Sequence, residues 1–138
     1  MIKVSVIGAG TMGSGIAQIA ATQGHEVCLY DNFDGAIENA TKKLHKILNR
    51  LVEKERLSLK EKENIISRIK FTKDIQEIKN SGLIIEAIIE NLEVKRKIFR
   101  EIDKLVHEDC ILASNTSSLS IASIAGACKK AERVIGIH

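Results

Sequence analysis

The sequence predicts an α/β fold, a doubly wound parallel sheet with an inserted pair of helices after the second strand. Two observations support this prediction. Short runs of β-branched and other aliphatic residues alternate with helical patterns along the whole chain. Most of these runs are almost continuously apolar, as expected for strands that are covered by helices on both faces of a sheet. Right-handed crossovers would then join successive parallel strands.

Six short apolar runs are predicted to be strands, and the segments between them are predicted to be helices. The expected strands are Ile2–Ile7, Glu26–Asp31, Ile69–Thr72, Leu83–Ile88, Ile111–Ser114 and Arg133–Ile137. The expected helices are Met12–Gln23, Gly35–Lys54, Leu59–Arg68, Asp74–Asn80, Glu93–His107 and Ser120–Cys128. The two helices within 35–68 make an insertion that is longer than an ordinary crossover.

Several of these helices have recognisable ends or faces. Gly24 is expected to stop the first helix, because glycine readily adopts the left-handed conformation found after a helix. The segment from Ser58 to Glu61 has the pattern of a capping box, which would open the helix that follows. Ile37, Leu44 and their neighbours repeat at a spacing of three to four residues, which indicates an amphipathic helix.

Composition describes an ordinary globular domain. The 138 residues are 44% hydrophobic and 28% charged, which suits one domain with a substantial core. Aromatic residues make up only 3% of the chain, which argues against a binder of single-stranded nucleic acid, since such proteins stack bases on aromatic rings. A net charge of +3 permits anionic ligands but does not indicate DNA.

The cysteines and the N-terminal segment bear on location. Cys28, Cys110 and Cys128 are odd in number and lack the spacing of metal ligands, so we expect structural thiols in a reducing compartment and no metal site. The first strand leads straight into a glycine-rich loop without a secretory apolar region. No stretch approaches the roughly 20 apolar residues of a membrane span. We expect a cytoplasmic protein with no membrane or nucleic-acid partner.

The glycine-rich loop is the first motif that carries chemistry. Gly8, Gly10 and Gly13 form the pattern G-x-G-x-x-G between a predicted strand and a predicted helix. In such a loop the glycines permit a tight turn, a close approach of backbone to a pyrophosphate, and close packing of helix on strand. The first helical turn, with Thr11 and Met12, would offer free N–H groups to the phosphates. The motif predicts a dinucleotide site, although FAD proteins share it and a glycine turn without a ligand is the alternative.

Asp31 indicates which dinucleotide would bind. It ends the second predicted strand, eighteen residues after Gly13. A carboxylate at this place can accept hydrogen bonds from the adenosine ribose hydroxyls, and it would repel a 2′-phosphate. Neither Asn32 nor Phe33 supplies a positive charge that would neutralise such a phosphate. The sequence therefore favours NAD over NADP.

Polar residues also follow three of the later strands. The segments are Ile84–Asn91, Ser114–Ser120 and Arg133–His138. In an open α/β sheet, ligands bind beyond the carboxyl ends of the strands. Together with the glycine loop, these segments resemble the 3-hydroxyacyl-CoA dehydrogenase family, including its 3-hydroxybutyryl-CoA members. The resemblance runs along the whole chain, and its most specific part is the Ser-Asn-Thr-Ser-Ser segment, whose Ser117 lies 21 residues before His138.

The resemblance implies a Rossmann fold. It also implies the interconversion of 3-hydroxyacyl-CoA and 3-oxoacyl-CoA by hydride transfer to or from NAD, with 3-hydroxybutyryl-CoA as the expected substrate. His138 would be the catalytic base that takes the hydroxyl proton, a task that suits imidazole because its ordinary pKa lies near neutrality. Ser117 would hydrogen-bond the reacting oxygen, or orient substrate and nicotinamide. Asn115 would line the nicotinamide side.

The same resemblance implies further contacts. Glu90 and Lys95 would lie near the nicotinamide ribose and the phosphates. Lys54, one of many basic residues on the predicted helices of 35–68, would meet a phosphate of the acyl-CoA substrate. Acidic residues are interleaved with these basic ones, so a solvated face is the alternative.

From the residues alone, several of these assignments have a structural alternative. Ser117 and Ser118 precede a predicted helix, where a serine commonly caps the N-terminus. Glu90 and Glu93 could stabilise the start of the following helix electrostatically. Lys95 could be a solvated surface charge.

The family continues beyond the histidine with a glutamate that orients it and an asparagine that holds the substrate oxygen. A helical domain then completes the acyl pocket and forms most of a homodimer interface. We therefore expect residues 1–138 to be the NAD-binding Rossmann domain without this second domain. One alternative is a stand-alone, non-catalytic dinucleotide-binding module. Another is the cofactor domain of a different hydroxyacid dehydrogenase, and the serine segment and its distance to His138 disfavour this one.

A turnover assay tests this expectation. The 138-residue chain should bind NADH but oxidise it with acetoacetyl-CoA at a small fraction of the rate of two-domain family members, because a base without its orienting carboxylate loses much of its efficiency. Absorbance of NADH is the measurement. A rate near that of the two-domain proteins would contradict the expectation.

Overall fold

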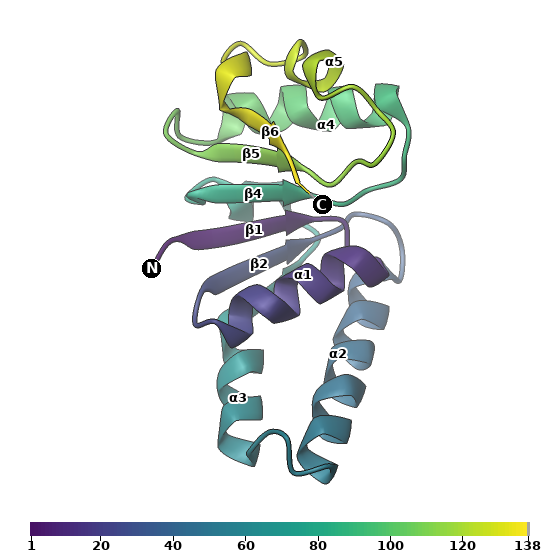
Figure 1. Ribbon diagram of the computed structural model, residues 1–138, viewed down its shortest axis with the longest axis vertical. Coiled ribbons are helices and arrows are strands. Elements are labelled where there is room, and N and C mark those ends of the chain that lie inside the picture. Colours follow the sequence, from purple (N-terminus) through teal and green to yellow (C-terminus); the bar gives the residue numbers. More distant parts are fainter. Residues whose placement is uncertain (138) are drawn as a thin grey trace.

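A six-stranded, all-parallel sheet organises the chain in the computed structural model, which describes residues 1–137 (Figure 1). Its strands lie in the order β3-β2-β1-β4-β5-β6, so the direction of winding reverses between β1 and β4. This order confirms the predicted doubly wound sheet. The strands are β1 (Lys3–Ile7), β2 (Glu26–Tyr30), β3 (Ile69–Thr72), β4 (Leu83–Glu86), β5 (Ile111–Ser114) and β6 (Val134–Gly136).

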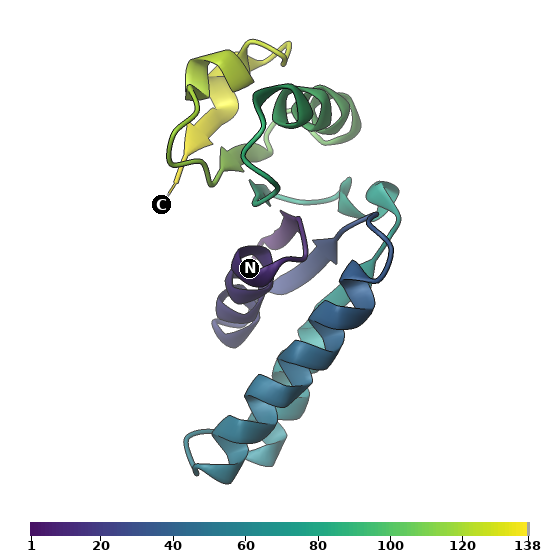
Figure 2. The same cartoon turned by 90° about the vertical axis from the view of Figure 1, so that its right-hand side faces the viewer.

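Helices join the strands as predicted. The α-helices are α1 (Thr11–Thr22), α2 (Ala36–Glu53), α3 (Leu59–Arg68), α4 (Leu92–Leu105) and α5 (Ile121–Ala125), with short 3-10 helices η1 (Ile75–Ile78) and η2 (Ala131–Arg133). Between β2 and β3, α2 and α3 run side by side and extend well away from the sheet (Figures 1 and 2). They are the inserted helical pair that the sequence predicts.

The two faces of the sheet carry separate apolar clusters, because successive residues of a strand point to opposite sides. Val6 and Leu29 pack on one face with side chains of α1, α2 and α3, among them Leu44. Ile84 and Leu112 pack on the other face with α4 and α5. Both faces are covered, which explains why the strands are continuously apolar in sequence.

Three predicted elements differ from the structure. The expected helix Asp74–Asn80 is only the four-residue η1, because Gly82 must already pair with Lys3 at the start of β4. The expected helix Ser120–Cys128 shortens to α5. The predicted strand Leu83–Ile88 ends at Glu86, because the N–H of Ile88 donates to the Glu86 carboxylate instead of to a neighbouring strand.

The predicted helix ends are confirmed. Gly24 follows α1 with φ of +98°, a conformation that side chains other than glycine rarely adopt. The capping box at the start of α3 is complete. The Glu61 N–H donates to Ser58 Oγ at 3.0 Å, and the Ser58 N–H donates to Glu61 Oε2 at 3.0 Å.

Replacing the cap of α3 should destabilise the domain. Ser58→Ala removes the acceptor of the Glu61 N–H, and we expect the free energy of unfolding to fall by about 1 kcal/mol. Urea denaturation is the measurement. Ser67→Ala is the matched control, since Ser67 is exposed in the same helix and bonds only a local carbonyl. Equal effects in the two variants would contradict the role of the cap.

Candidate functional site: the carboxyl edge of the sheet

The turn after β1 is built on backbone contacts that only glycine allows. Gly8 has φ of +108°, and a Cβ placed there would lie 2.6 Å from the carbonyl oxygen of Ala87. Its N–H donates to the carbonyl oxygen of Tyr30 at 2.8 Å. A Cβ on Gly13 would lie only 1.7 Å from the carbonyl oxygen of Gly8. The first turn of α1 therefore rests directly on the loop backbone.

The second glycine of the motif borders open space. A Cβ on Gly10 would meet no atom within 4 Å, and Gly10 is the N-cap of α1 without a side chain that caps the helix. Thr11 and Met12 lie exposed in the first turn. The N–H groups at this end of the helix thus face a space that a phosphate can enter, as the motif predicts.

Asp31 ties the end of β2 to the same loop. Its Oδ2 accepts a hydrogen bond from the N–H of Ala9 at 2.9 Å, and its Oδ1 accepts one from the N–H of Phe33 at 2.9 Å. Each carboxylate oxygen has two lone pairs, so both can still accept a bond from a hydroxyl. Asp31 therefore stiffens the loop and also presents acceptors beside it.

A cavity of about 800 Å³ opens between the glycine loop, the end of β2 and the start of α4. A volume of this size is typical of small-molecule and cofactor sites, which span roughly 300–1,000 Å³. Ile88 and Ile98 give it apolar walls, and Asp31 is among its polar lining residues. An apolar cleft that ends on free amides and a carboxylate suits a ligand with a flat base, a ribose and a diphosphate.

Across the strand-order reversal, Glu90 organises a second set of polar groups. Its carboxylate accepts hydrogen bonds from Thr116 Oγ1 at 2.8 Å and from the N–H of Ser117 at 3.1 Å. The hydroxyls of Ser117 and Ser118 lie 3.4 and 3.3 Å from Glu90 Oε2. The helix-capping alternative for these serines is wrong, because Ser120 caps α5 by accepting from the N–H of Ser123.

These bonds change the acidity of Glu90. The hydroxyl of Thr116 and the backbone N–H of Ser117, with a smaller contribution from Lys95, lower the pKa of the Glu90 carboxyl from 4.5 to about 2. Glu90 is thus an anion that holds the turn of residues 116–118. Its role in this structure is to bind that turn rather than only to stabilise the start of α4.

Lys95 lies directly behind Glu90. Its side chain is fully buried, with Nζ 2.5 Å from Glu86 Oε2, 3.4 Å from Glu90 Oε1 and 3.4 Å from the carbonyl oxygen of Ile88. The alternative of a solvated surface charge is therefore wrong. A contact between Lys95 and a cofactor stays a prediction, because Nζ faces these three acceptors and has no exposed surface.

Sequence reasoning missed Glu86. Its side chain is fully buried at the end of β4, where Ser114 Oγ donates to Glu86 Oε1 at 2.5 Å. The signal was present, since Glu86 is the one charged residue in the otherwise apolar run 83–89. A buried carboxylate needs partners, but the sequence does not show which residues supply them.

The remaining predicted site residues are dispersed. Asn115 follows β5 at the same edge, and its N–H donates to the carbonyl oxygen of Glu86 at 2.9 Å. His138 lies outside the described residues, while the N–H of Ile137 donates to the carbonyl oxygen of Ser114 at 3.0 Å. Lys54 is exposed at the C-cap of α2, at the end of the helical pair remote from the sheet (Figure 1).

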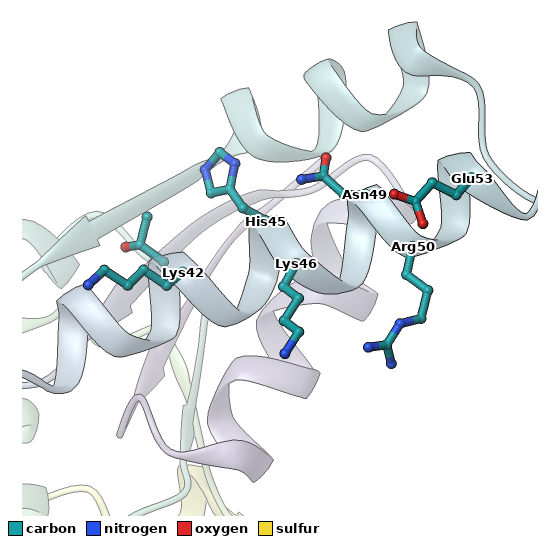
Figure 3. Close-up of a pocket in the computed structure, with 7 residues that line it drawn as sticks. Lys42, His45, Lys46, Asn49, Arg50 and Glu53 are labelled. Carbon is teal, nitrogen blue, oxygen red and sulfur yellow. The ribbon is translucent and has the colours of Figure 1, made fainter.

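The basic face of α2 forms a separate, open hollow (Figure 3). Lys46 and Arg50 point to one side of the helix, whereas His45 and Asn49 point to the other. The side chains do not converge on a common point, which is the arrangement expected of a solvated face.

Comparison with known proteins agrees with this geometry. A family model described as "3-hydroxyacyl-CoA dehydrogenase, NAD binding domain" matches residues 3–138. The chain belongs to this family. The NAD-binding domain is 44% identical over 137 residues to the 3-hydroxybutyryl-CoA dehydrogenase of Clostridioides difficile, an alignment that covers 99% of this chain and 49% of the relative. It is also 40% identical to human mitochondrial hydroxyacyl-coenzyme A dehydrogenase, with 98% of this chain and 45% of that protein covered.

Solved structures show the same relationship. The crystal structure of (S)-3-hydroxybutyryl-CoA dehydrogenase from Ralstonia eutropha superposes on the NAD-binding domain with a TM-score of 0.95 at 40% identity. This superposition covers the whole chain and 49% of the other protein. The chain thus spans about half the length of the curated relatives it matches. The glycine cradle, Asp31 and the cavity fit the NAD that the family binds.

Other kinds of site are not found within residues 1–137. No group of three or more His, Cys, Asp or Glu side chains is arranged there to hold a metal ion. In the same range, no helix has the length and apolar character needed to cross a bilayer. Cys28 and Cys110 are buried thiols, as predicted, and Cys128 is half-buried. Burial raises the pKa of the Cys110 and Cys128 thiols to about 11.

Substitution of the third glycine tests the loop packing. Gly13→Ala forces a methyl group against the Gly8 carbonyl, and we expect the free energy of unfolding to fall by about 3 kcal/mol, at the upper end of overpacking effects. Gly15→Ala is the matched control in the same helix, where a Cβ meets no atom within 4 Å. The control should raise stability by about 0.5–1 kcal/mol, because alanine favours helix. Thermal or urea denaturation is the measurement, and a Gly13→Ala variant as stable as wild type would contradict the contact.

The turn of residues 116–118 should resist acid. Because the folded pKa of Glu90 lies below its ordinary value, its hold on the turn is fully present above pH 4.5 and is lost as the pH falls through about 2. The measurement is the amide resonance of Ser117 in a pH titration followed by NMR. We expect a midpoint near 2 in the wild type and no such step in Glu90→Gln. A midpoint at 4 or above would contradict the hydrogen bonding described here.

Proposed function

We propose that this chain is the cofactor half of an NAD-dependent dehydrogenase that interconverts 3-hydroxyacyl-CoA and 3-oxoacyl-CoA, with 3-hydroxybutyryl-CoA as the expected substrate. One observation carries the proposal. The glycine-loop cavity, which spans the reversal between β1 and β4, and the Glu90-bound turn of Ser117 lie at the carboxyl edge of one sheet. This edge is where ligands of open α/β sheets bind.

NAD, when bound, would accept the hydride or return it. The chain's own part is to place the dinucleotide. The free N–H groups at Gly10, Thr11 and Met12 would meet the diphosphate, because a helix N-terminus favours anions. Asp31 would accept hydrogen bonds from the adenosine ribose, and its negative charge would disfavour a 2′-phosphate. The apolar walls of the cavity would keep water from the flat face of the base.

The second group of residues would serve the reacting end. Ser117 is exposed and its hydroxyl is directed by Glu90, which supports a role in orienting the reacting oxygen and the nicotinamide. Asn115 would line the nicotinamide side. Glu90, held as an anion, would keep this turn in place, and a contact of Lys95 with cofactor would come through the same cluster. His138 would act as the catalytic base, as the family resemblance implies.

The acyl-CoA substrate is proposed from the relatives, which are named for 3-hydroxybutyryl-CoA and, in Escherichia coli, for 3-hydroxyadipyl-CoA. Lys54 stays the predicted contact for a coenzyme A phosphate. Homodimer formation through a helical domain and a cytoplasmic location also stay predictions.

A titration of NADH tests the cofactor assignment. NADH fluorescence should rise saturably with the wild-type chain, and Asp31→Ala should weaken the affinity about tenfold, because a charge-assisted hydrogen bond is lost and the loop loosens. Asp109→Ala is the control, since it removes the same charge at an exposed position before β5. Unchanged affinity in Asp31→Ala would remove Asp31 from the ribose. No saturable binding to the folded wild type would overturn the proposed function.

A further inference from the structure

Glu86 occupies the centre of the sheet at its carboxyl edge. It pairs in register with Ile7 of β1 on one side and with Ser114 of β5 on the other. Its carboxylate accepts from Ser114 Oγ, from the N–H of Ile88 at 2.8 Å and from Lys95 Nζ. Every one of these donors is within 2.8 Å and the side chain is fully buried, so the carboxylate is held in place and cannot turn toward a ligand.

Lys95 lies between this carboxylate and that of Glu90. On the inner side, Lys95 Nζ lies 2.5 Å from Glu86 Oε2, and both side chains are fully buried. On the outer side, Lys95 Nζ lies 3.4 Å from Glu90 Oε1, and the Glu90 side chain is 36% exposed. A buried ammonium requires a close anion, because water cannot solvate it. If Glu86 did not supply that anion, Glu90 would be the nearest carboxylate to which Lys95 could turn.

Glu90 cannot both pair closely with Lys95 and hold the turn of residues 116–118 equally well. It now holds the turn of residues 116–118 through Thr116 Oγ1 and the N–H of Ser117. A lysine that closed onto Glu90 would compete with Thr116 at Oε1 and would pull on the carboxylate whose Oε2 accepts from the N–H of Ser117. The position of Ser117 therefore depends on whether the Lys95 ammonium pairs with Glu86 or with Glu90.

We propose that Glu86 is a positioning residue for the candidate active site. By neutralising Lys95 from behind, it keeps the ammonium off Glu90 and leaves Glu90 to hold Ser117 at the carboxyl edge of the sheet. The importance of this arrangement for hydride transfer rests on the proposed function, whereas the coupling of Glu86 to the Ser117 turn does not.

A second buried ion pair shows what a purely structural role would look like. Arg133 Nη2 lies 2.7 Å from Asp103 Oδ1, and both side chains are almost fully buried. This pair joins the end of α4 to η2 and has no hydrogen bond to the turn of residues 116–118. Asp103→Asn therefore matches Glu86→Gln in the loss of one buried negative charge.

The experiment follows the backbone amide of Ser117 by NMR in the folded chain without cofactor. In Glu86→Gln, Lys95 should move to Glu90, so the Ser117 resonance should shift and its hydrogen exchange should become about tenfold faster, as expected when an amide loses one hydrogen bond. Asp103→Asn should leave both unchanged. Glu86→Asp, which keeps the charge, should remain close to wild type.

The double variant Glu86→Gln, Lys95→Met separates positioning from general damage. Without the ammonium nothing competes for Glu90, so the Ser117 resonance should return toward its wild-type position. Replacing a buried ion pair by neutral side chains of similar size is commonly tolerated, so this variant should fold. An unchanged Ser117 amide in folded Glu86→Gln, or an equal displacement in the double variant, would overturn the proposal.

If Glu86→Gln does not fold, the NMR signal of the Lys95 ammonium in the wild type tests the proposal instead. We expect a slowly exchanging Nζ signal with scalar coupling to the Glu86 carboxylate carbon, and coupling to Glu90 alone would overturn the proposal. None of these measurements requires NADH. A wild type that fails to bind NADH would therefore remove the proposed function while the Ser117 results still test Glu86.

Discussion

The contact between the backbone of Gly8 and the first turn of α1 is the constraint on which the rest of the molecule depends. It brings the helix so close to the strand exit that a methyl group at Gly13 would overlap the Gly8 carbonyl. This closeness sets where α1 lies on the sheet and leaves its first amides facing open space. The same backbone geometry therefore serves packing and the binding of an anion, and a side chain at either glycine would disturb both.

Charge at the carboxyl edge is arranged in two different ways. Asp31 is half-buried and bonded to loop amides, so it combines a structural role with lone pairs that a ligand can use. Glu86 and Lys95 are fully buried at the same edge, and Lys95 lies between the Glu86 carboxylate and that of the partly exposed Glu90. Buried ion pairs contribute little net stability, so the cluster is better explained by the orientation it imposes than by the energy it supplies.

Much of the candidate site could be predicted because it depends on local sequence. The glycine spacing, the carboxylate after β2 and the serine segment after β5 each lie where a strand ends, and parallel strands bring their carboxyl ends together. What could not be predicted depends on partners distant in sequence. Ser117 and Ser118 have the pattern of helix caps, yet the carboxylate of Glu90, 27 residues before Ser117, binds them instead and leaves capping to Ser120.

The sequence by itself determined the alternation of strands and helices, the strand-order reversal expected of a doubly wound sheet, and the loop that accepts a diphosphate. These follow from apolar periodicity and from the conformations available to glycine, which are local properties. Only the tertiary structure decided that Lys95 is buried, that Glu86 is its partner and that Glu90 is left to hold the Ser117 turn. The physical reason is that a buried charge is stabilised by whichever groups the fold brings within hydrogen-bond distance, and these groups come from β4, α4 and β5 together.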